Sequence, residues 1–250
     1  MGQVIAVTNQ KGGVGKTTTT INVAYNLAKS GKKVLLVDLD PQGNASSGLN
    51  VSKSEKTTRD VLTGKNNLTE AVKATDYSNL SVLPTDAELA TLETEIATAK
   101  DRALRLKTAL QSSEFDIVLI DCPPSLGLLT VNALTAADSV IIPVQTEYYA
   151  LEGLGQLLET MKLVRQALNP SLAILGVVMT MHNSRTTLSA QVEEQLRSNF
   201  KERLFETVVP RNIRVAEAPS HGKPVGEYDK WSKGARAYKA LTKEVLERLS

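Results

Sequence analysis

The sequence contains a single cysteine, Cys122, and no apolar stretch long enough to cross a lipid bilayer. One cysteine excludes an intramolecular disulfide and any metal or cluster site that needs several thiolates from one chain, and it is typical of a reducing compartment. A bilayer-spanning helix needs about 20 consecutive apolar residues. An apolar run already begins at Val4, which leaves no room for a signal peptide before it. We therefore expect a cytoplasmic protein without stable membrane association.

An excess of charge of one sign is also missing, because 29 Lys and Arg stand against 27 Asp and Glu, for a formal net charge of +2. The chain is thus not a bulk polycation. The charge is nevertheless uneven, since residues 211–243 hold eight Lys or Arg and three acids. This stretch is either an electrostatic footprint for DNA or an ordinary solvated surface, and charge alone leaves both readings open.

Apolar runs rich in β-branched residues alternate along the chain with segments of helical periodicity. Continuously apolar runs, such as residues 34–37 and 117–120, are typical of parallel strands covered on both faces. We expect strands at residues 3–8, 33–38, 80–84, 116–121, 139–144, 173–180 and 206–209. We expect helices at residues 16–29, 86–95, 101–112, 126–137, 150–168, 186–199 and 234–249, with one or two short helices within 50–79. The alternation predicts an α/β fold with a doubly wound, mostly parallel twisted sheet flanked by helices, and ligands at the carboxyl ends of its strands.

A glycine-rich segment, Q-K-G-G-V-G-K-T-T, occupies residues 10–18 directly after the first expected strand. Its glycines let backbone N–H groups turn toward phosphate oxygens, its Gly-Lys-Thr lysine can reach the β- and γ-phosphates, and the following hydroxyl can bind Mg²⁺. A helix that begins at about Gly15 adds positive potential there. A turn without a ligand is the plainer reading, but strand, loop and helix occur in the order that the chemistry needs. The predicted nucleotide-binding residues here are Lys11, Gly12, Gly13, Val14, Gly15, Lys16, Thr17 and Thr18.

The start of this loop departs from the usual phosphate-loop pattern, which has a glycine at the position of Gln10 and no requirement for Lys11. The form x-K-G-G-x-G-K-T resembles the deviant Walker A motif of the ParA/MinD family of P-loop ATPases. The resemblance implies that Lys11 reaches the nucleotide of a second subunit in an ATP-sandwich homodimer. A cation supplied in trans acts like an arginine finger, which contributes ~10³–10⁵ in rate.

Carboxylates stand at the ends of two expected strands. Asp38 and Asp40 precede Pro41 at the second strand end, and Asp121 precedes Cys122 at the fourth. Such carboxylates beside a phosphate loop suit Mg²⁺ binding and the positioning of water. Both segments resemble the switch regions of the ParA/MinD family, which implies that Asp40 orients the attacking water with Asp38 in support. The alternative for Asp121 is a cap on the helix expected nearby. The predicted catalytic residues are Lys11, Lys16 and Asp40, and the predicted metal ligands are Thr17, Asp40 and Asp121.

Two later segments, residues 182–188 and 210–214, also follow expected strand ends. The resemblance implies that Pro210 and Asn212 lie beside the adenine. It also implies that Arg185 and Arg214 contact DNA phosphates. Lys223 and Arg236, from the basic stretch, complete the predicted DNA-binding set, which is Arg185, Arg214, Lys223 and Arg236.

The resemblance extends from residue 3 to about residue 245 and is closest to the short chromosomal ParA subgroup called Soj. It implies one ATPase domain over residues 1–250 that uses ATP and Mg²⁺ and segregates DNA. In such a cycle the ATP-bound homodimer binds double-stranded DNA of the nucleoid non-specifically, and a ParB-type centromere-binding protein stimulates hydrolysis and release. The cargo can also be something other than a chromosome or plasmid.

Two other function classes share the loop. A MinD-like membrane-cycling ATPase ends in an amphipathic helix with a bulky apolar face, whereas residues 234–249 carry a stripe typical of core packing. A metabolic ligase or an electron-transfer ATPase is the other class. Its iron-protein branch needs two cysteines per subunit, and this chain has one.

Overall fold

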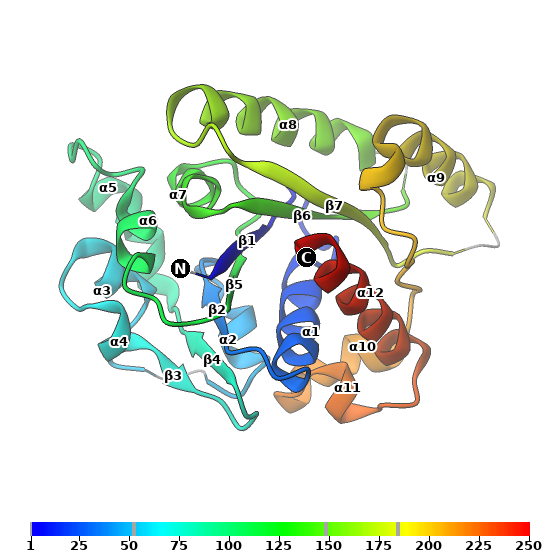
Figure 1. Ribbon diagram of the computed structural model, residues 1–250, viewed down its shortest axis with the longest axis horizontal. Coiled ribbons are helices and arrows are strands. Elements are labelled where there is room, and N and C mark those ends of the chain that lie inside the picture. The colour runs from blue at the N-terminus through cyan, green and yellow to red at the C-terminus, as the bar shows by residue number, and fades with distance from the viewer. Residues whose placement is uncertain (1, 52–53, 148–149, 184–185) are drawn as a thin grey trace.

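The computed structural model describes residues 2–51, 54–147, 150–183 and 186–250. Its strands are β1 (Gln3–Val7), β2 (Val34–Asp38), β3 (Lys73–Ala74), β4 (Leu80–Leu83), β5 (Ile117–Asp121), β6 (Ser139–Gln145) and β7 (Ala173–Thr180). They form one seven-stranded sheet in the order β3-β4-β2-β5-β1-β6-β7 (Figure 1). Neighbouring strands are parallel, except that β3 and β4 pair antiparallel at one edge. The predicted fold class, a mostly parallel α/β sheet, is confirmed.

Helices cover both faces of this sheet (Figure 1). The first face carries α1 (Lys16–Lys29), α2 (Asn44–Ser47), α10 (Ile213–Glu217), α11 (Val225–Tyr228) and α12 (Lys233–Leu249). The second face carries α3 (Thr58–Thr63), α4 (Leu68–Ala71), α5 (Leu92–Glu95), α6 (Arg105–Leu110), α7 (Leu128–Ala136), α8 (Ala150–Ala167) and α9 (Thr187–Phe200). Short 3₁₀ helices are η1 (Ala87–Thr91), η2 (Lys201–Arg203) and η3 (Ala218–His221). Within the described ranges, none of the helices combines the length and the hydropathy that crossing a membrane requires.

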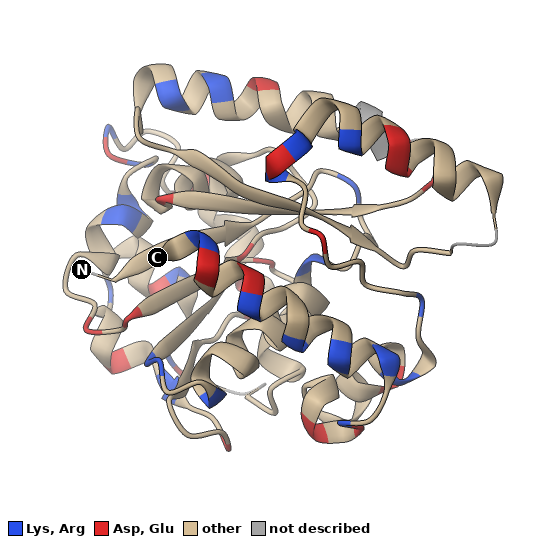
Figure 2. Ribbon diagram, turned by 45° about the vertical axis from the view of Figure 1, so that its right-hand side comes forward, with Lys and Arg blue, Asp and Glu red and all other residues tan. Residues whose placement is uncertain are grey.

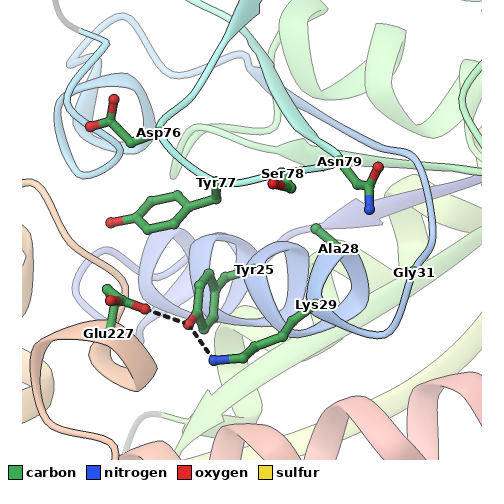
Figure 3. Close-up of a pocket in the computed structure, with 9 residues that line it drawn as sticks. All are labelled: Tyr25, Ala28, Lys29, Gly31, Asp76, Tyr77, Ser78, Asn79 and Glu227. Carbon is green, nitrogen blue, oxygen red and sulfur yellow. Dashed lines mark hydrogen bonds between the residues drawn. The ribbon is translucent and has the colours of Figure 1, made fainter.

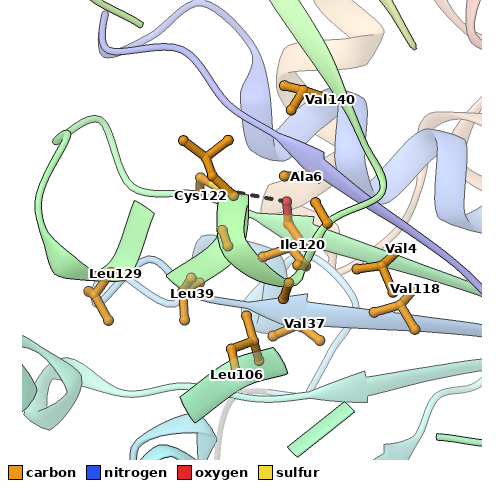
Figure 4. Close-up of a cluster of buried hydrophobic side chains, with 14 of the residues drawn as sticks. Val4, Ala6, Val37, Leu39, Leu106, Val118, Ile120, Cys122, Leu129 and Val140 are labelled. Atoms are coloured by element: carbon orange, nitrogen blue, oxygen red, sulfur yellow. Dashed lines mark hydrogen bonds between the residues drawn. The ribbon is translucent and has the colours of Figure 1, made fainter. Parts of the chain in front are cut away.

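Successive residues of the central strands point to opposite faces of the sheet, and both faces are apolar. Val4 and Ala6 of β1 belong to the core on the second face (Figure 4), whereas Ile5 and Val7 belong to the core under α1 and α12. The strands β2 and β5 alternate in the same way. Because both sides of these strands are buried, their sequences are continuously apolar. Polar side chains first appear at the carboxyl ends of the parallel strands. They therefore collect along that side of the sheet, which we call its carboxyl edge.

The segment 206–209, which we expected to be a strand, does not form one. Phe205 and Val209 each donate their N–H to a carbonyl of β7, at 2.8 and 2.9 Å. Residues 206 and 207 lie between these two. Their N–H groups donate instead to the Glu244 carboxylate on α12, at 2.9 and 2.8 Å. Each N–H donates to one partner, so these groups cannot continue a ladder along β7.

Other differences concern short elements. The helix expected at 86–95 is divided into η1 and α5, and the one expected at 101–112 is limited to α6. The region 50–79 contains α3 and α4, as expected, together with the unexpected two-residue strand β3. The short helices α2, α10 and α11 were not expected. The long helices α1, α8 and α12 agree with the predicted ranges within about one residue at each end.

Candidate active site

The glycine-rich loop joins β1 to α1 at the carboxyl edge of the sheet. Gly13 and Gly15 have φ values of 73° and 87°, a left-handed conformation that costs glycine little and other residues more. Gly15 is the N-cap of α1 and provides no side chain to bond the first N–H groups of the helix. A Cβ added at Gly12 or Gly13 would meet no atom within 4 Å. The first turn of α1 therefore begins without a side-chain cap, next to open space at Gly12 and Gly13, which suits phosphate binding.

The loop is anchored on its other side to β7. The Thr180 hydroxyl donates to the Val14 carbonyl at 2.8 Å, and Val14 itself is buried. The predicted base-binding segment lies near the same strand end, because His182 forms an isolated β-bridge with Pro210. Asn212 caps α10, and its side-chain oxygen accepts the N–H of Val215 at 3.4 Å. The structure thus brings Pro210 and Asn212 to the edge of the sheet that carries the loop.

Lys16, the lysine of the Gly-Lys-Thr sequence, is only 6% exposed. Its ammonium donates to the main-chain carbonyl of Lys11 at 3.0 Å. Burial lowers the pKa of Lys16, while the nearby charge of Asp121 opposes that shift. A phosphate oxygen is a stronger partner for this ammonium than a neutral carbonyl, because its negative charge adds Coulomb attraction to the hydrogen bond.

Asp38 and Asp121 lie side by side at the ends of β2 and β5, and both are fully buried. Burial, with the neighbouring charge of Asp38, raises the pKa of Asp121 to about 8, although the hydroxyls of Thr17 and Thr20 favour its charged form. Burial also raises the pKa of Asp38 to about 6, against the hydrogen bonds from Ser46. Two adjacent buried carboxylates favour retention of a proton, and a bound cation would remove the need for it.

The three aspartates have different partners. Asp38 accepts both the N–H and the hydroxyl of Ser46, at 2.8 and 2.7 Å, so it holds the start of α2 and the loop before it. Asp40 is 8% exposed and accepts the N–H of Gln42 at 3.0 Å. Asp121 accepts the Thr20 hydroxyl at 3.0 Å through Oδ1. Asp121 caps no helix, because α7 begins at Leu128 after the N-cap Gly127, so the capping alternative is wrong.

The residues around Asp121 suit a divalent cation. Its Oδ2 is buried and has no hydrogen-bond partner among the described residues. Thr17 lies close enough for its hydroxyl to interact with this carboxylate. In the part of the chain that the structure describes, no three His, Cys, Asp or Glu side chains form a metal cluster. Mg²⁺ commonly uses one or two protein oxygens together with water and substrate phosphates, so the Asp121 carboxylate and the Thr17 hydroxyl fit it.

Lys11 is held by an acid that we did not predict for the site. Its ammonium lies 3.2 Å from Oε2 of Glu147, which follows β6 at the same edge of the sheet. The other carboxylate oxygen lies 3.9 Å from the Arg211 guanidinium. Glu147 lies just beyond a strand end, and its partners are far away in the sequence, so its contact with Lys11 leaves no local signal.

Three of the four predicted DNA-binding residues belong to the part of the chain that the structure describes. Arg185 lies outside the described residues. Arg214 is paired with Glu217 at 3.0 Å and with Asp229 at 3.5 Å. Lys223 and Arg236 are both exposed. Figure 2 shows further basic residues along α12, and its exposed Lys and Arg include Arg236, Lys239 and Lys243.

A cavity of about 480 Å³ lies away from this edge, at the far end of α1 (Figure 3). Its nearest lining residue on α1, Tyr25, lies about 14 Å along the helix from Lys16 at the loop. Tyr25 donates to Glu227 at 2.8 Å and accepts from Lys29 at 3.0 Å. These polar groups bond to one another, and the cavity contains none of the predicted site residues.

Comparisons with known proteins show which chains this one resembles. A family model described as an AAA domain matches residues 2–174. The chain is 53% identical to the sporulation initiation inhibitor protein Soj of Bacillus subtilis, over 98% of both chains. It is 48% identical to the chromosome partitioning protein ParA of Myxococcus xanthus, over 99% of this chain and 89% of that protein. The solved structure of cobyrinic acid a,c-diamide synthase from Mycobacterium smegmatis with bound ATP analog and magnesium has a TM-score of 0.90 and 38% identity, covering 100% of this chain and 96% of that one.

Proposed function

Because the chain belongs to the ParA/Soj family of chromosome-partitioning ATPases, we propose that it segregates DNA through an ATP-controlled dimer cycle. ATP binding closes a homodimer, and the dimer binds double-stranded DNA of the nucleoid without sequence preference. A ParB-type partner stimulates hydrolysis, which separates the subunits and releases the DNA. The observation that carries this proposal is the phosphate loop with Lys11 at its start, exposed at the carboxyl edge of the sheet.

The phosphates of ATP bind at the loop of residues 11–18, with the Lys16 ammonium moving from the Lys11 carbonyl to the β- and γ-phosphates. Thr17 and Asp121 would hold Mg²⁺ with support from Asp40, and the unpartnered Oδ2 of Asp121 would be the available oxygen. A bound Mg²⁺ would neutralise the charge that develops on the phosphates during transfer. Asp40 orients the attacking water, while Asp38 keeps the Asp40 segment in place through Ser46. Pro210 and Asn212 flank the adenine.

Lys11 completes the site of the other subunit. An ammonium placed on the transferring phosphoryl group stabilises its charge in the transition state and contributes ~10³–10⁵ in rate. Hydrolysis therefore depends on dimer closure. The partial exposure of the Lys11 side chain, 31%, supports this role because the side chain is accessible from outside the subunit.

The DNA-binding surface combines Arg185, Arg214, Lys223 and Arg236 with the basic residues of α12. A single subunit offers few phosphate contacts, and dimer closure doubles them. Doubling the contacts raises the affinity steeply and makes it dependent on salt, because each neutralised phosphate releases counterions. Arg214 contributes when a phosphate replaces its acidic partners.

The test is binding to random-sequence duplex DNA with ATP, with ADP or without nucleotide. We expect binding by the wild type only with ATP, and loss of binding in Lys11→Ala and in Arg236→Ala. Lys162→Ala is the control, because Lys162 is exposed on α8 and belongs neither to the predicted nucleotide site nor to the predicted DNA-binding surface. Binding that ignores the nucleotide would contradict the dimer cycle, and no binding under any condition would contradict DNA segregation.

Two other function classes have their own tests. The apolar face of α12 is buried in the core at Tyr238, Leu241 and Val245, which argues against its use as a membrane anchor. ATP-dependent sedimentation with liposomes would support a MinD-like cycle. The likeness to a diamide synthase is the observation that favours a ligase. An increase in ATP turnover that depends on a small molecule, without DNA or a partner protein, would support that class.

A further inference from the structure

Lys11 is held at three points within its own subunit. Its N–H donates to the Asn9 side chain at 3.1 Å, and its carbonyl accepts the Lys16 ammonium at 3.0 Å. Its own ammonium bonds to Glu147 at 3.2 Å. A side chain that acts in a neighbouring subunit must give up the last of these contacts. The geometry of Glu147 therefore bears directly on dimer closure.

The Glu147 carboxylate has partners besides Lys11. Its Oε1 accepts the Gln145 amide at 2.5 Å and lies 3.9 Å from the Arg211 guanidinium. Arg211 belongs to the segment that we place beside the adenine. The carboxylate therefore keeps a cation and a hydrogen-bond donor when Lys11 departs, which lowers the cost of the exchange.

We infer that Glu147 is a positioning residue that retains Lys11 in the separate subunit. When Lys11 crosses to the partner, the Glu147 carboxylate pairs with Arg211 instead. This inference rests on the proposed dimer cycle. Nucleotide binding starts the exchange, because the γ-phosphate draws Lys16 away from the Lys11 carbonyl and removes one of the three contacts. Glu147 thereby keeps the ammonium away from solvent anions and from premature contacts between subunits.

The strength of this contact follows from its exposure. The side chains of Lys11 and Glu147 are 31% and 47% exposed, and ion pairs of this kind shift an equilibrium about two- to fivefold. A symmetric dimer breaks two such contacts, so its dissociation constant carries the square of that factor, about four- to 25-fold. A contact of this size favours the position of Lys11 within its own subunit but does not prevent the dimer from closing.

The test measures dimer dissociation constants by sedimentation equilibrium, with Mg²⁺ and a non-hydrolysable ATP analogue and without DNA. Glu147→Gln removes the charge and preserves the shape of the side chain. Glu159→Gln is the matched control, since Glu159 is an exposed glutamate on α8 that pairs with Lys162 at 3.9 Å. Each protein is measured at ~50 mM and ~500 mM salt, because salt screens exposed ion pairs. Analogue binding to the monomer, at concentrations too low for dimers, reports whether each variant is folded.

We expect Glu147→Gln to dimerise about four- to 25-fold more tightly than the wild type at low salt, with a smaller advantage at high salt. Monomer binding of the analogue and the behaviour of Glu159→Gln should match the wild type. Equal or weaker dimerisation by Glu147→Gln, while the wild type dimerises, would overturn the inference and leave the dimer cycle standing. A wild type that does not dimerise with the analogue would overturn the cycle itself, and this inference with it.

Discussion

Replacing Asp121 by asparagine should change how the stability of the protein depends on pH. Burial and the charge of Asp38 raise the pKa of Asp121 from 3.8 to about 8. An asparagine at this position keeps the shape of the side chain and can still accept the Thr20 hydroxyl through its amide oxygen. The substitution therefore removes one titrating group from the pair and leaves the surrounding packing in place.

Proton binding determines whether the free energy of unfolding rises or falls with pH. Because the folded pKa of Asp121 lies above its unfolded value, the folded protein binds more protons than the unfolded chain between the two. The stability contributed by the protonated form is complete below the unfolded pKa and is lost as pH rises toward the folded one. A difference of one proton changes the free energy of unfolding by about 1.4 kcal/mol per pH unit. From about pH 6, above which Asp38 is mostly ionised, to about pH 7.5, the wild type should lose about 2 kcal/mol more than Asp121→Asn.

Urea unfolding in buffer with a chelator measures this difference, at several pH values in that range and without nucleotide. The two histidines are present in both proteins, so their titration cancels in the comparison. Asp101→Asn is the control, because Asp101 is exposed and pairs with Arg105 on the surface, and it should follow the wild type. Identical pH slopes for the wild type and Asp121→Asn would show that Asp121 is ionised in the folded protein, and the argument from the buried pair would fail.

Three further results are expected. Asp40→Asn should lower the rate of ATP hydrolysis by ~10²–10⁴ with nearly unchanged nucleotide affinity, measured by phosphate release and by binding of a fluorescent ATP analogue; normal turnover would refute the role of Asp40. The affinity of the ATP-bound protein for duplex DNA should fall by ~10³ or more between ~50 and ~200 mM salt, and a flat profile would contradict phosphate contacts. Leu36→Ala in the fully buried β2 should cost about 2–5 kcal/mol in urea unfolding. Leu163→Ala, at a side chain that is 60% exposed, should cost little, and equal costs would contradict the burial.

The sequence patterns that predicted the fold are those in which local chemistry and tertiary burial agree. Buried parallel strands are continuously apolar, so β2 and β5 were identified within about one residue at each end. The segment 206–209 is apolar at one end only, and its N–H groups find the Glu244 carboxylate, 37 or more positions away in the sequence. A competing partner at that distance leaves no local signal. The same reason applies to β3, whose two residues form a strand only because β4 lies beside them.

The residues of the candidate site also differ in whether their partners are close in the sequence. The loop of residues 10–18 was predictable because its glycines, its lysines and the start of α1 are contiguous, and each is needed for phosphate binding. The separate roles of Asp38 and Asp40 were only suggested by the sequence, since the partner of Asp38 is Ser46 in the next helix. Glu147 was not among the predicted site residues, because its contact with Lys11 joins the ends of two strands 136 positions apart. The parallel sheet brings together at one edge the residues that follow separate strands, so the acid that retains Lys11 becomes visible only once the strand order is known.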